Sequence, residues 1–177
     1  VQWNMTGQHS VANALATIAA AEHVGVSIET ACKALSNFGG VKRRMELLGT
    51  VRGIEIYDDF AHHPTAIDTT LEGARKRLGE RKLWAIIEPR SNTMRMGSHK
   101  DGLAHSARLA DEVIWYQPEG LDWDLQPVIN AATNQAQIAR SLDDIINKIS
   151  QEAGEGDAVV IMSNGGFGGL HQKLITA

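Results

Sequence analysis

The chain has 177 residues, of which 43% are hydrophobic and 21% are charged, and its formal net charge is −4 at pH 7. This composition supports a folded core and excludes a disordered chain, and the small negative charge offers no general attraction to nucleic acid or to an anionic membrane. A single cysteine, Cys32, excludes an intrachain disulfide and predicts a cytoplasmic location. The chain starts at Val1 without a methionine or a basic leader, which predicts a fragment of a longer protein that lacks a secretion signal.

Two helices are predicted at the start of the chain. Alanine-rich periodicity predicts the first over residues 8–24, and Ser27 is a suitable N-cap for a second helix over residues 28–37. Two consecutive glycines then interrupt the helical pattern. We therefore expect residues 1–39 to be the helical end of one domain and residues 40–177 to form a second domain.

Strands and helices alternate along the second domain. The predicted strands are 47–51, 54–57, 82–87, 112–116 and 157–162, and the predicted helices are 64–78, 99–110, 141–149 and one that starts at Leu170. The first two strands form a hairpin around Arg52-Gly53, and residues 117–127 are expected to be irregular. This order predicts an α/β fold with a doubly wound, mostly parallel sheet and an antiparallel edge hairpin.

The segment Asp58-Asp59-Phe60-Ala61-His62-His63-Pro64-Thr65 lies at a predicted strand-to-helix turn. Open α/β sheets bind ligands at such turns, and carboxylates with imidazoles can ligate a metal, relay protons or bind the ribose and base of a nucleotide. The spacing matches no zinc signature, so no metal site is predicted. The alternative is a structural role, in which these side chains cap the helix and fill the turn.

Three other segments carry candidate binding groups. Arg90, Ser91, Asn92 and Arg95 follow a buried strand and could bind a carboxylate bidentately, although an ordinary surface loop is the alternative. Ser163, Asn164 and Gly165 open a glycine-rich turn whose amides could face an anion, or which could be only a tight turn, since it is not a P-loop. The arginines in Lys42-Arg43-Arg44 could clamp phosphate or protect a strand edge.

Five segments occur in an order that resembles the ATP-dependent Mur ligase family. They are Gly7 to Ala16, Gly40 to Glu46, Asp58 to Thr65, Glu88 to Arg95 and Ser163 to Leu170. The resemblance implies a three-domain enzyme, of which this chain would contain the end of the central ATPase domain and a whole Rossmann-like C-terminal domain. Closure of the C-terminal domain onto the central domain would place the turn that starts at Asp58 at the interface between these two domains.

The resemblance also implies roles for individual residues. The residues expected on the ATP side are His9, Asn13, Arg44, Asp58, Asp59 and His62. The residues expected on the acceptor side are Arg90, Ser91, Asn92, Arg95, Ser163, Asn164 and Gly165. ATP and Mg²⁺ would be bound mainly by the part of the central domain that this chain lacks, so no complete catalytic set is expected.

The implied reaction belongs to peptidoglycan recycling. ATP would activate UDP-N-acetylmuramate as an acyl phosphate, and the amine of the murein tripeptide L-alanyl-γ-D-glutamyl-meso-diaminopimelate would displace phosphate. The fragment alone is expected to be inactive, with neither nucleic acid nor membrane as a partner. Two alternatives come from the residues themselves: a non-catalytic peptide- or amino-acid-binding module, and a metal hydrolase that uses the cluster from Asp58 to His63.

Overall fold

The computed structural model describes residues 1–3, 5, 7–90, 100–117, 119–121 and 123–177. Its helices are α1 (Gln8–His23), α2 (Ile28–Ser36), α3 (Pro64–Leu78), α5 (Lys100–Ser106), α6 (Gln126–Asn130), α7 (Leu142–Glu152), the 3-10 helix η1 (Phe167–Gly169) and α8 (Leu170–Thr176). Its strands are β1 (Glu46–Val51), β2 (Ile54–Asp59), β3 (Leu83–Ile87), β4 (Glu112–Tyr116), β5 (Gln135–Ala139) and β6 (Ala158–Met162).

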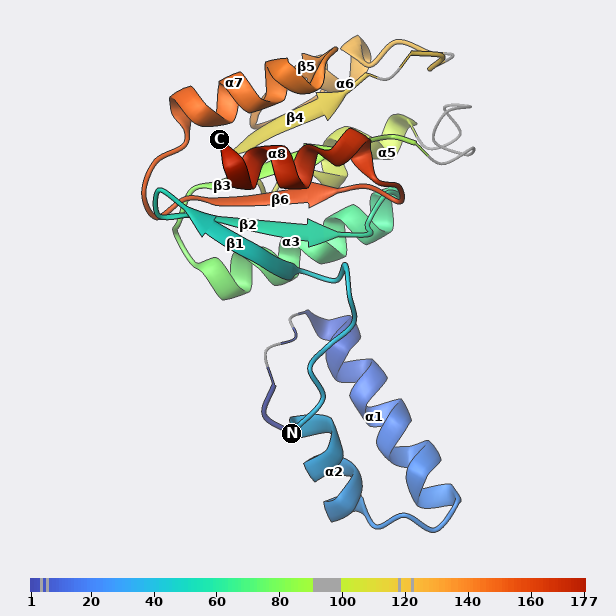
Figure 1. Cartoon of the computed structure of the whole chain (residues 1–177). Coiled ribbons are helices and arrows are strands. Elements are labelled where there is room, and N and C mark those ends of the chain that lie inside the picture. Colours follow the sequence, from blue (N-terminus) through green and yellow to red (C-terminus); the bar gives the residue numbers. More distant parts are fainter. Residues whose placement is uncertain (4, 6, 91–99, 118, 122) are drawn as a thin grey trace.

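The six strands form one sheet in the order β1-β2-β6-β3-β4-β5 (Figure 1). β1 pairs with β2 in an antiparallel hairpin, and every other pair is parallel. The predicted fold class is therefore confirmed, with the hairpin at the edge of a parallel sheet. β6, the last strand in the chain, lies between β2 and β3, so the carboxyl ends of these three strands are neighbours.

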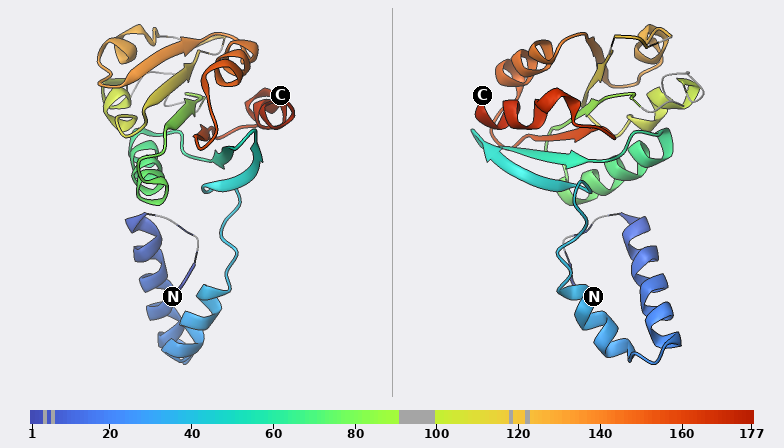
Figure 2. Two further views of the ribbon diagram at one scale, coloured as in Figure 1. Left: turned by 90° about the vertical axis from the view of Figure 1, so that its left-hand side faces the viewer. Right: turned by 45° about the vertical axis from the view of Figure 1, so that its right-hand side comes forward.

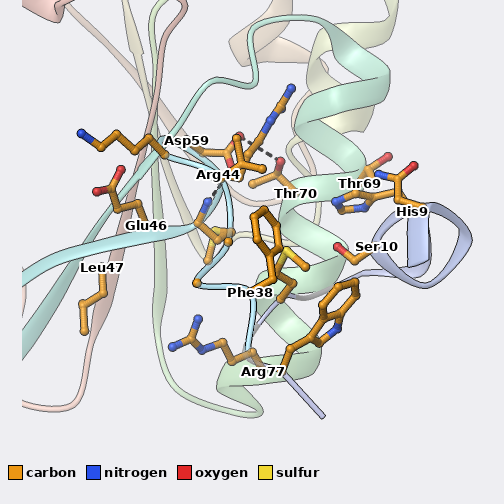
Figure 3. Close-up of a pocket in the computed structure, with 18 of the residues that line it drawn as sticks. His9, Ser10, Phe38, Arg44, Glu46, Leu47, Asp59, Thr69, Thr70 and Arg77 are labelled. Carbon is orange, nitrogen blue, oxygen red and sulfur yellow. Dashed lines mark hydrogen bonds between the residues drawn. The ribbon is translucent and has the colours of Figure 1, made fainter. Parts of the chain in front are cut away.

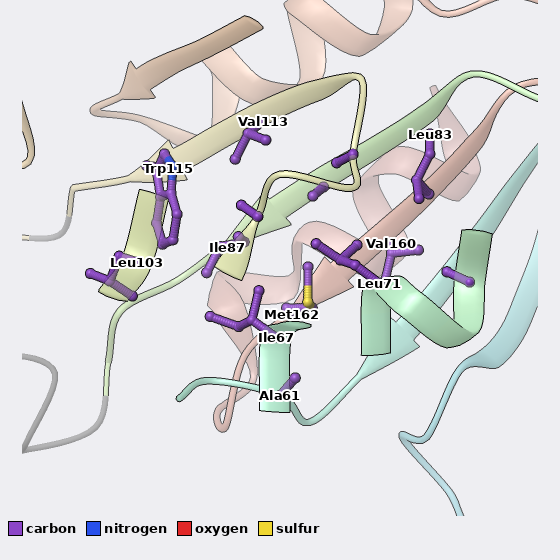
Figure 4. Close-up of a cluster of buried hydrophobic side chains, with 14 of the residues drawn as sticks. Ala61, Ile67, Leu71, Leu83, Ile87, Leu103, Val113, Trp115, Val160 and Met162 are labelled. Atoms are coloured by element: carbon purple, nitrogen blue, oxygen red, sulfur yellow. The ribbon is translucent and has the colours of Figure 1, made fainter. Parts of the chain in front are cut away.

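Helices cover both faces of the sheet, as a doubly wound architecture requires (Figure 2). On one face α3, α5 and α6 pack on alternate strand residues, among them Val160, Met162 and Trp115 (Figure 4). On the other face α7, η1 and α8 pack on the intervening residues, such as Ile161 and Trp84. The strands β3 and β6 are buried along their whole length, which explains why their sequences are continuous apolar runs.

Local sequence signals fix several helix ends. α3 begins with Pro64 at its first position, where no amide hydrogen is needed, and it covers the predicted residues 64–78. Ser27 caps α2 by accepting a hydrogen bond from Thr30 N–H. Ser141 and Asp144 form a reciprocal capping box at the start of α7. The predictions of these three helices are confirmed.

The structure corrects the sequence expectations in three places. β2 continues through Asp58 and Asp59, which were expected in the turn after a strand ending at Tyr57. α5 ends at Ser106, so the helix expected to continue to Ala110 gives way to turns. β5 and α6 were not predicted, and the first two residues of α6 fall in the stretch 117–127 that was expected to be irregular. β5 is an edge strand whose residues are mostly partly exposed, and its composition therefore lacks the apolar run that identified β3 and β6.

α1 and α2 pack against each other as a helical hairpin, and residues 37–45, here called the connector, join it to the sheet unit of residues 46–176 (Figure 1). α1 also contacts α3. Several apolar side chains of the hairpin are exposed, including Leu15 at 64% and Val24 at 75%. The division of the chain at residue 39 into two domains stays a prediction. No helix among the described residues is long and apolar enough to cross a membrane.

Candidate functional site

The carboxyl ends of β2, β3 and β6 bring together three of the segments that the sequence singled out. Ser163 N–H donates to the carbonyl of Asp59 at 3.1 Å, and Glu88 N–H donates to the carbonyl of Met162 at 3.0 Å. The turn after β2, the loop after β3 and the glycine-rich loop after β6 therefore start side by side. In open α/β sheets this edge is where ligands bind.

Asp58 is enclosed by two basic side chains. Its Oδ2 accepts a hydrogen bond from Arg43 Nε at 2.9 Å, and its Oδ1 lies 3.0 Å from His171 Nε2, in the first turn of α8. Burial raises the pKa of this carboxyl, but the hydrogen bonds and charges of His171 and Arg43 outweigh burial, so the pKa of Asp58 lies below its usual value. Both oxygens are thus used within the protein.

Asp59 has a different environment although it is the next residue. Its side chain is buried, and it accepts hydrogen bonds from Met45 N–H at 2.8 Å, from Ala61 N–H at 2.8 Å and from Thr70 Oγ1 at 3.1 Å. Burial nevertheless raises the pKa of Asp59, because these bonds and the charge of Arg44 only partly compensate for the lost solvation. Asp59 therefore ties the end of the connector to the turn and to α3.

A buried pair of polar side chains, Ser163 and Glu88, supports the glycine-rich loop. Ser163 is fully buried, its hydroxyl donates to Glu88 Oε2, and it accepts a hydrogen bond from Gly165 N–H at 2.9 Å. Arg90 is exposed and its guanidinium lies against Gly165, where a Cβ would collide with Arg90 Nη1. A side chain at position 165 would therefore displace the Arg90 guanidinium from its place against the loop.

A cavity of about 1230 Å³ lies between the helical hairpin and the sheet unit (Figure 3). His9 and Asn13 of α1 line one wall, as expected from their spacing of one helical turn. The cavity is also lined by Thr69 and Thr70 of α3 and, from the connector, by Arg44. The structure thus brings four of the six residues predicted for the ATP side to one cavity: His9, Asn13, Arg44 and Asp59.

The charged groups around the cavity favour an anionic ligand. Arg44 and Arg77 both line it, with their guanidinium carbons 5.9 Å and 5.3 Å from the ring centroids of Phe60 and Tyr57, respectively. Of the acids on the wall, Asp59 accepts three hydrogen bonds through both oxygens, and Glu46 Oε2 accepts one from Arg43 N–H at 2.8 Å. The cavity can therefore receive phosphate groups, and its donor set does not resemble a cation site.

The two histidines of the turn separate in space. His63 lines the cavity, whereas His62 is not among its lining residues, and His62 Nδ1 lies 2.9 Å from the carbonyl of Phe60. Across the residues that the structure describes, no three His, Cys, Asp or Glu side chains are grouped so that they could hold a metal ion. The arrangement around Asp58 therefore gives no support to the metal-hydrolase alternative.

Some predicted acceptor-side residues cannot be placed, and some important residues were missed. Ser91, Asn92 and Arg95 lie outside the described residues. No role was predicted for His171, Thr70 or Glu88, and Arg43 was predicted only as one of several basic residues that could clamp phosphate or protect a strand edge. His171 carries no local signal, because it meets Asp58 across 113 residues of chain. Thr70 is 11 residues from Asp59, and the two side chains meet only because α3 packs beside the end of β2.

Comparison with known proteins places these observations in a family. Residues 43–165 match the family described as the glutamate ligase domain of Mur ligases. The chain is similar to proteins named UDP-N-acetylmuramate–L-alanyl-γ-D-glutamyl-meso-2,6-diaminoheptandioate ligase. It is 48% identical over 176 residues to the one from Haemophilus influenzae and 46% identical over 176 residues to the one from Escherichia coli.

Solved structures agree with the sequence comparison. The chain superposes on a murein peptide ligase from Psychrobacter arcticus with a TM-score of 0.78 and 60% identity, over 99% of this chain and 38% of that one. A domain described as part of such a ligase from Haemophilus ducreyi gives a TM-score of 0.65 and 40% identity, over 75% of this chain and 98% of that one. The two curated relatives are matched over 99% of this chain but only 39% and 38% of their own lengths.

Proposed function

The family match covers more than half of the chain, so the chain belongs to the Mur ligase family, and on that premise we propose that it is the C-terminal part of an ATP-dependent peptide ligase. The proposed substrates of the whole protein are UDP-N-acetylmuramate and the tripeptide L-alanyl-γ-D-glutamyl-meso-diaminopimelate. ATP would activate the muramyl carboxylate as an acyl phosphate, and the tripeptide amine would then displace phosphate. The names of the relatives support this choice of substrates.

The observation that carries the nucleotide half of the proposal is the cavity between the helical hairpin and the sheet unit. His9 and Asn13 would contact the adenine side, and Arg44 would contact phosphate. Asp59 would not bind ATP directly with its oxygens, because they are used by Met45, Ala61 and Thr70; it would shape the wall beside Arg44. We expect His62 and Asp58 to act in the same indirect way.

Magnesium would neutralise phosphate charge during the transfer. Asp59 uses both carboxylate oxygens in hydrogen bonds within the protein and Glu46 uses one, and the described residues contain no group of three acidic, histidine or cysteine side chains that could hold a metal ion. We therefore expect the magnesium ligands to come from the preceding part of the protein, which this chain does not include.

The acceptor half of the proposal rests on the loops after β3 and β6. Arg90 is exposed beside Gly165, where its guanidinium could bind a carboxylate of the tripeptide. Asn164 Oδ1 is buried and accepts no hydrogen bond from any described residue, so it could accept one from a substrate amide. Ser163 would support this loop from below through Glu88, since its own side chain is fully buried.

The experiment uses the full-length protein encoded with this chain. ATP, UDP-N-acetylmuramate and the tripeptide are incubated together, and the product is measured by mass spectrometry along with released phosphate. We expect a product of UDP-N-acetylmuramate plus tripeptide with one phosphate per product, and no product from the 177-residue chain alone. Absence of product with the full-length protein, at substrate concentrations that saturate binding, would refute the proposal.

The same assay distinguishes a ligase from the alternative, a non-catalytic peptide-binding module. Such a module would bind the tripeptide in titration calorimetry without ATP hydrolysis or product. Its affinity would also be unaffected by ATP and by Asp59→Ala. A ligase instead couples phosphate release to the presence of both the sugar and the peptide.

A further inference from the structure

Arg43 is the residue that joins the connector to the glycine-rich loop. Its Nη2 donates hydrogen bonds to the carbonyl of Ser163 at 2.7 Å and to the carbonyl of Gly165 at 2.9 Å, while its Nε donates to Asp58 at 2.9 Å. The side chain is only 30% exposed. One guanidinium fork therefore fixes two carbonyls of the loop relative to the end of β2.

The backbone at Arg43 directs this side chain inward and leaves Arg44 on the cavity. Arg43 has a φ of 59°, its N–H donates to Glu46 at 2.8 Å, and its carbonyl accepts from Phe60 N–H at 2.8 Å. The positive φ is uncommon for a residue with a side chain, and here it is held from both sides. The two adjacent arginines therefore have different roles: Arg43 hydrogen-bonds the glycine-rich loop, and Arg44 lines the cavity.

Asp58 and His171 keep the guanidinium of Arg43 in place. The Asp58 side chain is 10% exposed and pairs with Arg43 through one oxygen and with His171 through the other. Because Asp58 belongs to the sheet and His171 to α8, the fork is anchored to two rigid elements. Its remaining donors can then set the orientation of the loop.

The orientation of the two carbonyls determines where the next N–H groups point. In a trans peptide the carbonyl and the following N–H point in opposite directions, and none of the described peptide bonds is cis. The N–H groups of Asn164 and Gly166 therefore point away from Arg43. Within the described residues neither of them donates a hydrogen bond. Gly165, against which Arg90 lies, is between them.

We propose that Arg43 is a positioning residue that presents the Asn164 and Gly166 N–H groups, beside the Arg90 guanidinium, to a carboxylate of the peptide substrate. This inference rests on the proposed ligase function, because it assigns a substrate group to the acceptor loop. Two amides and a guanidinium form an anion site in which only the guanidinium is charged. Arg43 itself would touch no substrate.

The test compares Arg43→Lys with Arg52→Lys in the full-length protein. Lysine retains the charge but replaces the planar fork with a single ammonium, which cannot hold Asp58 and both carbonyls in the same geometry. Arg52 is a matched control, because it also has a positive φ, of 51°, and donates to a backbone carbonyl, that of Ser150, at the hairpin turn. Arg43→Met removes all the donors and should have a larger effect.

We expect Arg43→Lys to raise the KM for the tripeptide by about tenfold, which corresponds to roughly one lost hydrogen bond, and to leave the KM for ATP within about twofold. Hydrogen exchange followed by mass spectrometry should show faster exchange in the peptide that contains residues 163–169, in the absence of substrate. Arg52→Lys should change neither quantity. A general structural defect would instead raise both KM values and speed exchange throughout the sheet.

Three results would overturn the inference: unchanged exchange at residues 163–169 in Arg43→Lys, an unchanged KM for the tripeptide, or parallel changes in both KM values. If Arg43→Met does not fold, the lysine variant decides alone. If the wild-type full-length protein makes no product, the proposed function fails. Local exchange and tripeptide binding by calorimetry then still decide whether Arg43 positions the loop.

Discussion

Replacing Asp59 with asparagine isolates the hydrogen bond that Met45 N–H donates to Asp59 Oδ2 at 2.8 Å. The asparagine amide would place an NH₂ group opposite this N–H, so two donors would face each other. Rotating the amide does not help, because Ala61 N–H would then face the NH₂ group. Loss of one hydrogen bond to a charged group costs about 1.5–3 kcal/mol, and relief of the buried charge returns part of it, so we expect a loss of about 2 kcal/mol of unfolding free energy.

Urea denaturation of the 177-residue chain, followed by fluorescence of its buried tryptophans, measures this change. For a chain of this size a loss of about 2 kcal/mol lowers the melting temperature by about 4–8 °C. Asp68→Asn is the control, because Asp68 pairs with Arg108 at a partly exposed site and should lose no more than about 1 kcal/mol. A loss at Asp59 no larger than that of the control would refute the assignment of Asp59 as the tie between connector and turn.

Three further predictions concern the acceptor loop, the acid stability and a helix end. Gly165→Ala should displace the exposed Arg90 side chain and raise the KM for tripeptide in the full-length protein, while unfolding free energy changes by less than about 0.5 kcal/mol; a normal KM would contradict this. Because the pKa of Asp58 is lower in the folded chain, its stabilising contribution is complete above the unfolded-state pKa of about 3.9 and is lost as pH falls through the folded-state pKa. In Asp58→Asn the unfolding free energy, measured by denaturation at a series of pH values, should therefore fall less steeply at acid pH than in the wild type. An unchanged acid dependence would contradict the stabilising role of Asp58. Ser141→Ala should remove the capping box with Asp144 and lower the unfolding free energy by about 1 kcal/mol, measured by urea denaturation, whereas no change would show that the cap is not needed.

The sequence was sufficient for those parts of the fold whose signals are local. Continuous apolar runs identified β3 and β6, and Pro64 marked the start of α3 at the residue where it begins. β5 escaped prediction because an edge strand buries little surface and needs no apolar run. The short helix α6 also has too few residues to show a period.

The candidate site could be predicted only in part from the sequence, because most of its contacts are not local. The density of acids and imidazoles at the end of β2 and in the turn after it predicted where a site would lie, but not that Asp58 and Asp59 would face different partners. Their partners come from the connector, from α3 and from α8, and only the folded chain brings these together. The direction in which the Arg43 side chain points depends on its positive φ, which the arginine residue type does not predict.

The place of β6 in the sheet has a consequence for how the chain acquires its structure. β6 is synthesised after the other five strands of this sheet, yet it is the partner of both β2 and β3. Until it is available, the β1–β2 hairpin and the group of β3, β4 and β5 have no strand between them and expose two unpaired edges. Such edges invite association with other chains during biosynthesis. A stop codon before residue 158 would therefore leave two separate half-sheets rather than a slightly shortened domain.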